Sequence, residues 1–525
     1  MKISTMMSSL LGVFVGSAPL AFAAPSSSHT APSAAALYES VKHDPVQLGL
    51  FMQSFPKGAD LHNHMSGAIY AESFLKWAAK DGLCVNLPQG KIVPERCGAP
   101  VEGMEAAASL SSDAPAWNGM IDALSMRDFV PTATDRSGHD HFFSTFERFV
   151  ALEKDHQGDM LAEALEHAAH DHVQYLELQV STASSAGLDS MMAAVKNKQL
   201  NNAADIPAFH QALQPVLPKM VEASRKGVDA MEKRAHEVLQ CGTAQAKPGC
   251  GVTVRYLFET LRIVPPKVTY PQLEVGYAVV KNDPRFVGVN IAAPEDDATA
   301  LHDYDLHMQM FHYLNSVYPG VKLSLHAGEI TPSLVPLADL DHHIWSAIDV
   351  AGAQRIGHGI DVMWEHDPAE LLAKMARQHI MVEVNLTSND EILGIKGDHH
   401  PFELYRRAGV PVALSTDDEG VSRGSLTNEY VRAAQTYHLS YNDLVQLSRT
   451  GLEYNFLPGQ SLWVDHHIGQ RVPACHTASV TSSLPQSCAT FLENNPKARL
   501  QWQLETRMAE FERLAVRNPV LSHAR

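Results

Sequence analysis

The sequence predicts an α/β fold: a (β/α)₈ TIM barrel with an N-terminal helical extension and disulfide-bearing insertions. Two observations lead to this prediction. Eight short, apolar, β-rich runs alternate with longer helical stretches between roughly residues 55 and 460. Polar residues also stand at the carboxyl ends of the first, fifth, sixth and eighth runs, and barrel active sites are built at those ends.

The first residues have the pattern of a targeting segment. Lys2 precedes a mostly apolar run from Met6 to Leu20, and Ala21-Phe22-Ala23 supplies a small-x-small cleavage pattern. We therefore expect a signal peptide over residues 1–23, cleaved near Ala23, and a secreted or periplasmic protein. No later segment approaches the roughly 18 apolar residues that span a bilayer, so the mature chain is expected to be free of the membrane.

The next segment, residues 24–54, is predicted to be a linker and a helix, with a helical pattern from Ala35 to Phe55. The strand candidates follow, and the later ones are nearly continuous apolar runs, as expected of parallel strands buried on both faces. The predicted strands are Ala59–His64, Val173–Val180, Val252–Glu259, Phe286–Ala292, Lys322–His326, Arg355–His358, Met381–Asn385 and Val410–Thr416. Helices are expected between them, for example at Leu301–Ser316 and Pro368–Gln378. A doubly wound open sheet is the alternative, but it does not naturally bring those four strand ends to one point.

The chain has 525 residues, more than the roughly 250 of a typical barrel, so we expect insertions. They are predicted near residues 81–140 and 181–250, and a C-terminal loop and helix over 461–525. Six cysteines form three local pairs by proximity: Cys84/Cys97, Cys241/Cys250 and Cys475/Cys488. Disulfides in an oxidising compartment explain them best. Zinc binding is the alternative, but the sequence contains no Cys-x-x-Cys. The net charge of -18, with no Lys/Arg cluster to offset it, argues against a nucleic-acid partner.

Four residues at strand ends have the composition of a catalytic zinc site. His62 and His64 alternate with Asn63 and therefore point to the same face of a strand. His326 and Asp417 end later strands. Three imidazoles and a carboxylate would leave one position open for a water molecule, whose pKa a zinc ion lowers toward neutrality.

Three further residues beside these ligands could perform acid-base chemistry: Glu329, His358 and Asp418. Each has a structural interpretation on its own, since Asp418 could help cap a helix and Glu329 could be a first-turn acid. Their joint position at strand ends favours an active site. By contrast, the doublets His342-His343, His399-His400 and His466-His467 lie in polar contexts and are expected to be exposed.

At these motifs the chain resembles the adenosine deaminase family of metal-dependent barrels. The matching segments, in the family's order, are Pro56–His64, Tyr175–Leu178, Leu325–Glu329, Arg355–Gly359 and Ser415–Asp418. The export signal, the helix before the first motif and the cysteines resemble the secreted, growth-factor-related branch.

The resemblance implies one zinc ion bound by His62, His64, His326 and Asp417, and a purine nucleoside as substrate. Glu329 would protonate N1, Asp418 would hydrogen-bond N7, and the Gly328 backbone would border the purine. His358 would be the base and electrostatic anchor for the attacking water. The expected reaction is the hydrolytic deamination of adenosine, and of 2′-deoxyadenosine, to inosine and ammonia.

The sequence departs from the family pattern at two places. Ser66 follows the histidine pair where many members carry an aspartate that contacts ribose, and its hydroxyl could still bind a sugar hydroxyl. Ala293 stands where the fourth strand often ends in Gly-Asp/Glu, and its backbone N–H could still reach N3 of the purine. Both departures affect sugar recognition rather than chemistry.

Other functions stay open at this point. The enzyme could deaminate adenine or a modified adenosine, or the chain could be a secreted nucleoside-binding protein without turnover. A binuclear amidohydrolase would want a bridging lysine at the end of the fourth strand, and residues 286–297 contain none. The retention of Glu329 and His358 favours an enzyme.

Overall fold

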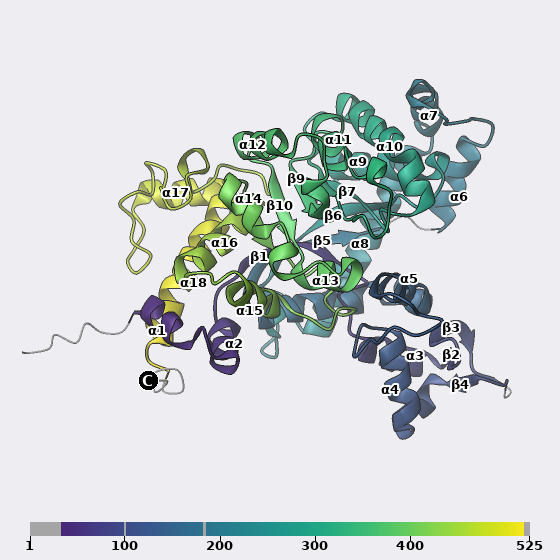
Figure 1. Ribbon diagram of the computed structural model, residues 1–525, viewed down its shortest axis with the longest axis horizontal. Coiled ribbons are helices and arrows are strands. Elements are labelled where there is room, and N and C mark those ends of the chain that lie inside the picture. The colour runs from purple at the N-terminus through teal and green to yellow at the C-terminus, as the bar shows by residue number, and fades with distance from the viewer. Residues whose placement is uncertain (1–32, 99–100, 182–184, 519–525) are drawn as a thin grey trace, which may run out of the picture.

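Among the described residues, eight parallel strands close into a barrel (Figure 1). The computed structural model describes residues 33–98, 101–181 and 185–518, so the predicted signal peptide lies outside the described residues. Two four-stranded sheets, β1-β5-β6-β7 and β8-β9-β10-β11, are joined by bridges between Val289 and Leu323 and between Asn63 and Asp417. The strands are β1 (Gly58–His64), β5 (Val173–Val180), β6 (Thr253–Leu261), β7 (Phe286–Ala292), β8 (Ser324–Ala327), β9 (Arg355–His358), β10 (Met381–Val384) and β11 (Val412–Leu414).

The predicted strands are confirmed, with small shifts at their ends. β6 extends to Leu261, β8 begins two residues later than predicted, and β11 is shorter than the predicted Val410–Thr416. Ser415 still donates to the Val384 carbonyl, and the chain turns at Asp417, whose backbone is left-handed with φ 60°. The open-sheet alternative is wrong, since β1 and β11 are neighbours.

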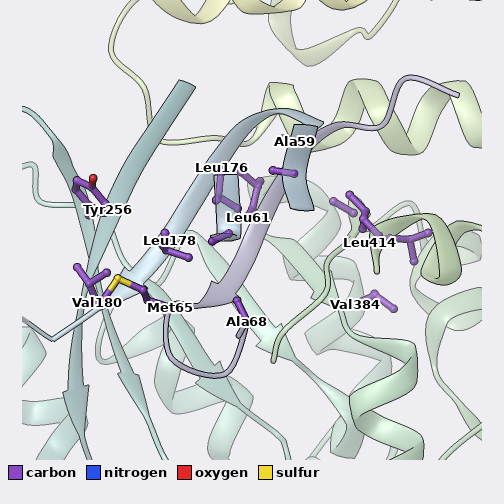
Figure 2. Close-up of a cluster of buried hydrophobic side chains, with 14 of the residues drawn as sticks. Ala59, Leu61, Met65, Ala68, Leu176, Leu178, Val180, Tyr256, Val384 and Leu414 are labelled. Carbon is purple, nitrogen blue, oxygen red and sulfur yellow. The ribbon is translucent and has the colours of Figure 1, made fainter. Parts of the chain in front are cut away.

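The strands share one apolar core, part of which Figure 2 shows. On β1, Ala59 and Leu61 belong to this core, and Leu176 and Leu178 of β5 lie beside them. Because side chains alternate along a strand, His62 and His64 are on the other face from Leu61. β1 therefore supplies core packing on one face and chemistry on the other.

Helices cover the barrel, as a parallel sheet requires. The helices predicted at Leu301–Ser316 and Pro368–Gln378 are confirmed. The covering helices are α5 (Gly138–His170), α9 (Pro266–Asn282), α10 (Ala298–Val317), α11 (His343–Asp349), α12 (Pro368–Gln378), α13 (Leu386–Leu393), α14 (Phe402–Ala408), α15 (Leu426–Thr436) and α16 (Tyr441–Glu453).

The N-terminal extension is two helices, whereas the sequence predicts one from Ala35 to Phe55. α1 (Ala34–Val41) ends before Asp44, whose side chain caps α2 (Pro45–Gln53). Pro45 lacks an N–H and so cannot continue α1, but it suits the first position of a new helix. Tyr38 and Phe51 pack against Tyr441 of α16, which docks the extension onto the barrel.

The insertions carry all three predicted disulfides. After α3 (Ala71–Asp81), an antiparallel sheet of β2 (Leu83–Asn86), β3 (Lys91–Arg96) and β4 (Met104–Ala106) contains Cys84–Cys97, and α4 (Ala114–Ala123) follows. Helices α6 (Ser185–Ala194), α7 (Ile206–Leu213) and α8 (Leu217–Leu239) precede Cys241–Cys250. The disulfide Cys475–Cys488 joins a loop to α17 (Gln486–Asn494), and α18 (Pro496–Ala515) is the last helix of the described residues. Within the described residues, no helix is both long and apolar enough to cross a membrane.

Candidate active site

The four predicted metal ligands converge at the carboxyl ends of β1, β8 and β11. The Nε2 atoms of His62, His64 and His326 lie 3.1, 3.3 and 3.4 Å from one another. Asp417 Oδ1 lies 3.3 Å from the Nε2 atoms of both His62 and His64. Four ligands about 2.0–2.1 Å from a tetrahedral zinc ion are about 3.3–3.4 Å apart, so these atoms fit such an ion.

The other nitrogen of each imidazole contacts a polar side chain that fixes the ring. His62 Nδ1 lies 2.7 Å from Glu383, His64 Nδ1 lies 2.5 Å from Glu259, and His326 Nδ1 lies 3.1 Å from the Asn290 oxygen. A carboxylate can only accept a hydrogen bond, so the Nδ1 atoms of His62 and His64 donate and their Nε2 atoms face inward, where they can bind a proton or, in its place, a metal ion. A cation between these inward-facing nitrogens satisfies them.

The electrostatic surroundings also favour a cation. Burial acts to lower the pKa of His62, but the carboxylates of Asp417 and Glu383 outweigh it and raise the pKa to about 9. The Asp417 carboxyl is held ionised, because His62 and His64 overcome the effect of burial and keep its pKa well below the usual range. The cluster therefore attracts positive charge.

Glu329, predicted as an acid, lies beside these ligands and is buried. One carboxylate oxygen is 3.5 Å from His358 Nε2, and the other is 3.7 Å from an Arg262 nitrogen. Burial and the nearby Asp417 charge raise the pKa of Glu329 to about 8, although Arg262 opposes them. Glu329 thus holds a proton at neutral pH and can donate it.

His358 ends β9 and is fully buried. Its backbone is left-handed, with φ 69°, which is uncommon for a residue other than glycine and concentrates at functional sites. Burial lowers the pKa of His358 to about 3, so the ring is neutral. Its Nε2 faces Glu329 and Asp417, while its Nδ1 faces Asn389.

Asp418 is buried next to the ligands, and its Oδ1 has no hydrogen-bond partner among the described residues. Burial and Asp417 raise the pKa of Asp418 to about 8, against the opposing effect of His64. Gly67 packs so closely that an added Cβ would lie 1.5 Å from Asp418 Oδ1. A glycine at position 67 therefore leaves room for this carboxyl.

The predicted purine-binding backbone positions also lie at strand ends. Gly328 has φ 75°, and its N–H donates to Glu295 Oε1 at 3.1 Å. Ala293 has φ 87°, and its carbonyl accepts from Arg262 at 2.6 Å. Both turns follow β8 and β7, on the side of the barrel that holds the histidine cluster.

Ser66 lies half-buried in the turn after β1, and a helix brings it a carboxyl partner. The Ser66 hydroxyl lies near the carboxyl of Glu153 of α5. Burial raises the pKa of Glu153 to about 7 with a contribution from Glu259, while the nearby Ser66 hydroxyl acts to lower it. The sequence did not indicate Glu153, because it lies in mid-helix and 87 residues from Ser66 in the chain.

Sequence reasoning also missed residues behind the site. Glu295 accepts hydrogen bonds from the backbone of Gly328 and Glu329 and contacts His343 Nδ1 at 2.6 Å. His343 and His400 are buried, so the prediction that their doublets are exposed is wrong for these two residues. Arg262 follows the last residue of β6, and its place at a strand end is a signal that could have identified it.

A model of the adenosine deaminase family matches residues 120–462, well over half of the chain. The chain belongs to the adenosine deaminase family. An adenosine deaminase of Shewanella loihica is 34% identical to this family member over 139 residues, which are 26% of this chain and 39% of the relative. An aminodeoxyfutalosine deaminase of Streptomyces coelicolor is 35% identical over 153 residues, 29% of this chain and 37% of the relative. The aligned stretches thus span less than two-fifths of either relative.

A solved structure of Arabidopsis ADAL complexed with IMP has the same fold as this adenosine deaminase family chain. It superposes with a TM-score of 0.52 at 19% identity, over 88% of this chain and 99% of that chain. The growth-factor-related branch stays a prediction.

Proposed function

We propose that this chain is a zinc-dependent hydrolase that converts adenosine, and also 2′-deoxyadenosine, to inosine. Water adds at C6 of the purine and ammonia leaves. The observation that carries this proposal is the convergence of three imidazole nitrogens and the Asp417 carboxylate, 3.1–3.4 Å apart, with the buried carboxyl of Glu329 beside them.

His62, His64, His326 and Asp417 would hold the zinc ion. Their mutual distances of 3.1–3.4 Å and their inward-facing imidazole nitrogens support this assignment. A bound zinc ion would lower the pKa of a water molecule toward neutrality and so supply the nucleophile.

The acid-base residues suit the purine ring. N1 and N7 are both acceptors, so each needs a protonated partner. Glu329 donates a proton to N1, which makes C6 electrophilic. Asp418, with its pKa raised to about 8, is protonated and donates a hydrogen bond to N7. His358 faces the same space and anchors the attacking water.

The base of the nucleoside would lie in the buried part of the site, and the sugar would lie nearer the surface. The backbone at Gly328 and Ala293 would border the base. Exposure increases toward His64 and Glu259, whose side chains are 12% and 18% exposed, whereas His62 and His358 are fully buried. The sugar would leave the base on this open side, near Ser66.

Deamination of another aminopurine is the second candidate. The similarity to an aminodeoxyfutalosine deaminase makes aminodeoxyfutalosine a candidate substrate, in addition to adenine and modified adenosines. A nucleotide is disfavoured because the open side carries the carboxyls of Glu153 and Glu259, which would repel a phosphate.

We also propose that the protein is exported, to the periplasm or the outside of the cell. The signal-like sequence at 1–23 supports this, as do three disulfides that each close a short loop. Mass spectrometry of the mature N-terminus in the native host would test it. A cytosolic chain that retains residues 1–23 would contradict it.

The substrate is tested by incubating purified protein with adenosine, 2′-deoxyadenosine, adenine, AMP and aminodeoxyfutalosine. Loss of the adenine absorbance band and release of ammonia are followed with and without a chelator. We expect adenosine to be the best substrate, the chelator to stop turnover, and about one zinc ion per chain by elemental analysis. If no compound is turned over and no zinc co-purifies, the hydrolase proposal is wrong.

Glu329→Gln is the sharpest variant, because it removes the acidic proton and keeps the shape of the side chain. We expect kcat to fall by about 100-fold or more while zinc content stays near that of the wild type. Glu493→Gln, an exposed change on α17, is the matched control and should leave kcat unaltered. Loss of zinc in Glu329→Gln would instead make Glu329 a structural residue.

A further inference from the structure

The two ring nitrogens of His358 face different surroundings. Nε2 faces the site and has no hydrogen-bond partner among the described residues. Nδ1 points away from it, 2.9 Å from Asn389 Nδ2 and 3.4 Å from Asn385 Nδ2. A neutral imidazole carries one proton, so its position decides whether Nε2 donates or accepts inside the site.

The position of that proton can be traced from a backbone group whose direction is fixed. The N–H of Phe402, the first residue of α14, donates to His400 Nδ1 at 3.1 Å. A backbone N–H can only donate, so His400 Nδ1 is an acceptor. His400 is buried, and burial lowers its pKa to about 3, so the ring is neutral and its single proton is on Nε2.

The proton on His400 sets the orientation of the next side chain. His400 Nε2 donates to Asn389 Oδ1 at 3.1 Å. The oxygen of this buried amide therefore faces His400, and its NH₂ group faces His358. The amide donates to His358 Nδ1, which leaves the proton of neutral His358 on Nε2. The opposite amide orientation would require His400 Nε2 to accept, and its Nδ1 already accepts from Phe402.

The same short helix also holds the backbone of the histidine. Tyr405 of α14 donates its hydroxyl proton to the Gly359 carbonyl at 2.6 Å. His358 and Gly359 are both left-handed, with φ 69° and 60°. Figure 1 places α14 beside β10, the neighbour of β9, and α13, which carries Asn389, follows β10 in the chain. α14 thus fixes both the ring and the main chain of His358.

We propose that His400 is a positioning residue which, through Asn389, keeps the proton of neutral His358 on Nε2. This nitrogen then donates a hydrogen bond to the oxygen that joins the substrate carbon. The resemblance implies two roles for His358, as the base that deprotonates the attacking water and as its electrostatic anchor. A proton on Nε2 supports the role of anchor, because a protonated Nε2 cannot accept the proton of the water. The tautomer follows from the hydrogen bonds alone, whereas its effect on turnover rests on the proposed function.

The tautomer is tested by NMR of the zinc-loaded protein labelled with ¹⁵N-histidine. The chain has 28 histidines, so the His358 signals are identified as those missing from His358→Gln. We expect a protonated, pyrrole-type Nε2 and an unprotonated, pyridine-type Nδ1. A proton on Nδ1 would overturn the proposal whether or not the protein deaminates adenosine.

Turnover provides the second test. In Asn389→Asp the new carboxylate can only accept, so it should draw the proton of His358 to Nδ1 and leave a lone pair facing the site. We expect kcat to fall about 100- to 1,000-fold, with KM within about threefold and zinc content unchanged. The NMR pattern of His358 should reverse in the same variant. Wild-type kcat in a variant whose His358 tautomer has reversed would overturn the proposal.

His400 is tested by a conservative pair of variants. Gln at position 400 can accept from Phe402 and donate to Asn389, so His400→Gln should retain the Nε2 proton of His358 and most of the turnover. Leu can do neither, so His400→Leu should lose both. His399→Gln, at the exposed neighbour, is the matched control. Equal effects of His400→Gln and His400→Leu would mean that position 400 acts by packing alone, which would also overturn the proposal.

Discussion

At the level of single residues, the proposed function assigns recognition of the sugar to the open side of the site. At position 66 many family members carry an aspartate, whereas the serine of this chain is shorter and uncharged. Glu153 of α5 places a carboxyl beside Ser66. We expect this pair to bind sugar hydroxyls in the way that one carboxylate does elsewhere.

Glu153→Gln tests this expectation. A hydrogen bond to a charged group contributes about 1.5–3 kcal/mol, so inosine should inhibit the variant with a Ki raised about tenfold or more. Hypoxanthine, which lacks the sugar, should bind both forms equally. Glu147→Gln, at an exposed position of the same helix, is the control. If the binding of inosine and the binding of hypoxanthine weaken by the same factor, Glu153 affects the base or the fold and not the sugar.

Residues of the site were predictable from the sequence where chemistry coincides with a strand end. His62, His64, His326 and Asp417 were all predicted this way, and the structure brings them together. Glu153 and His400 were not predictable, because a mid-helix acid and a loop histidine have no distinguishing local pattern. Their positions depend on how distant elements pack, which a single sequence does not display.

At the scale of elements, Lys57 joins three segments at the amino end of β1. Its Nζ is fully buried and donates to the carbonyls of Met52, Phe55 and Asp171 at 2.8, 3.1 and 2.9 Å. These carbonyls come from α2, from the turn after it and from the end of α5. One ammonium group thus anchors the N-terminal extension and the long helix to the barrel.

Lys57→Met should be strongly destabilising, because Lys57 is the donor to the buried carbonyls of Phe55 and Asp171, whereas Met52 also accepts from the Phe55 N–H. Each unsatisfied group costs about 1–3 kcal/mol, so we expect the free energy of unfolding to fall by about 3 kcal/mol or more. Urea denaturation measures it. Lys76→Met, on the exposed face of α3, is the control and should change stability little. A loss equal to that of the control would show that water or rearrangement satisfies these carbonyls.

The type of each barrel strand was predictable because apolar runs and their turns are local signals. The break between α1 and α2 was also visible in Asp44-Pro45, but the apolar periodicity runs across it and favoured one helix. The β2-β3-β4 sheet was expected only as an insertion, since its strands are short, half of β3 is exposed and β4 is only half-buried.

At the scale of the whole molecule, the balance of buried acids sets the pH dependence of stability. Burial raises the pKa of Glu391 to about 8 and of Glu429 to about 7, although Thr387 donates a hydrogen bond to Glu429 that acts to lower its value. Both acids lie on α13 and α15, away from the metal ligands. A carboxyl group whose pKa is higher in the folded than in the unfolded protein stabilises the fold at a pH below its unfolded pKa of about 4.5. This stabilisation is lost as the pH rises through the pKa of the folded state. The fold should therefore be more stable at pH 5 than at pH 8.5.

Glu429→Gln tests this dependence, because an amide of the same shape cannot ionise. Glu429 is almost fully buried, and a pKa raised from 4.5 to about 7 corresponds to at most about 3 kcal/mol. Unfolding free energies measured from pH 5 to pH 8.5 should fall more steeply for the wild type than for the variant, so the variant gains relative stability as the pH rises. Glu493→Gln should follow the wild type throughout. Parallel curves for wild type and Glu429→Gln would mean that water reaches this carboxyl and that it ionises in the fold at its ordinary pKa.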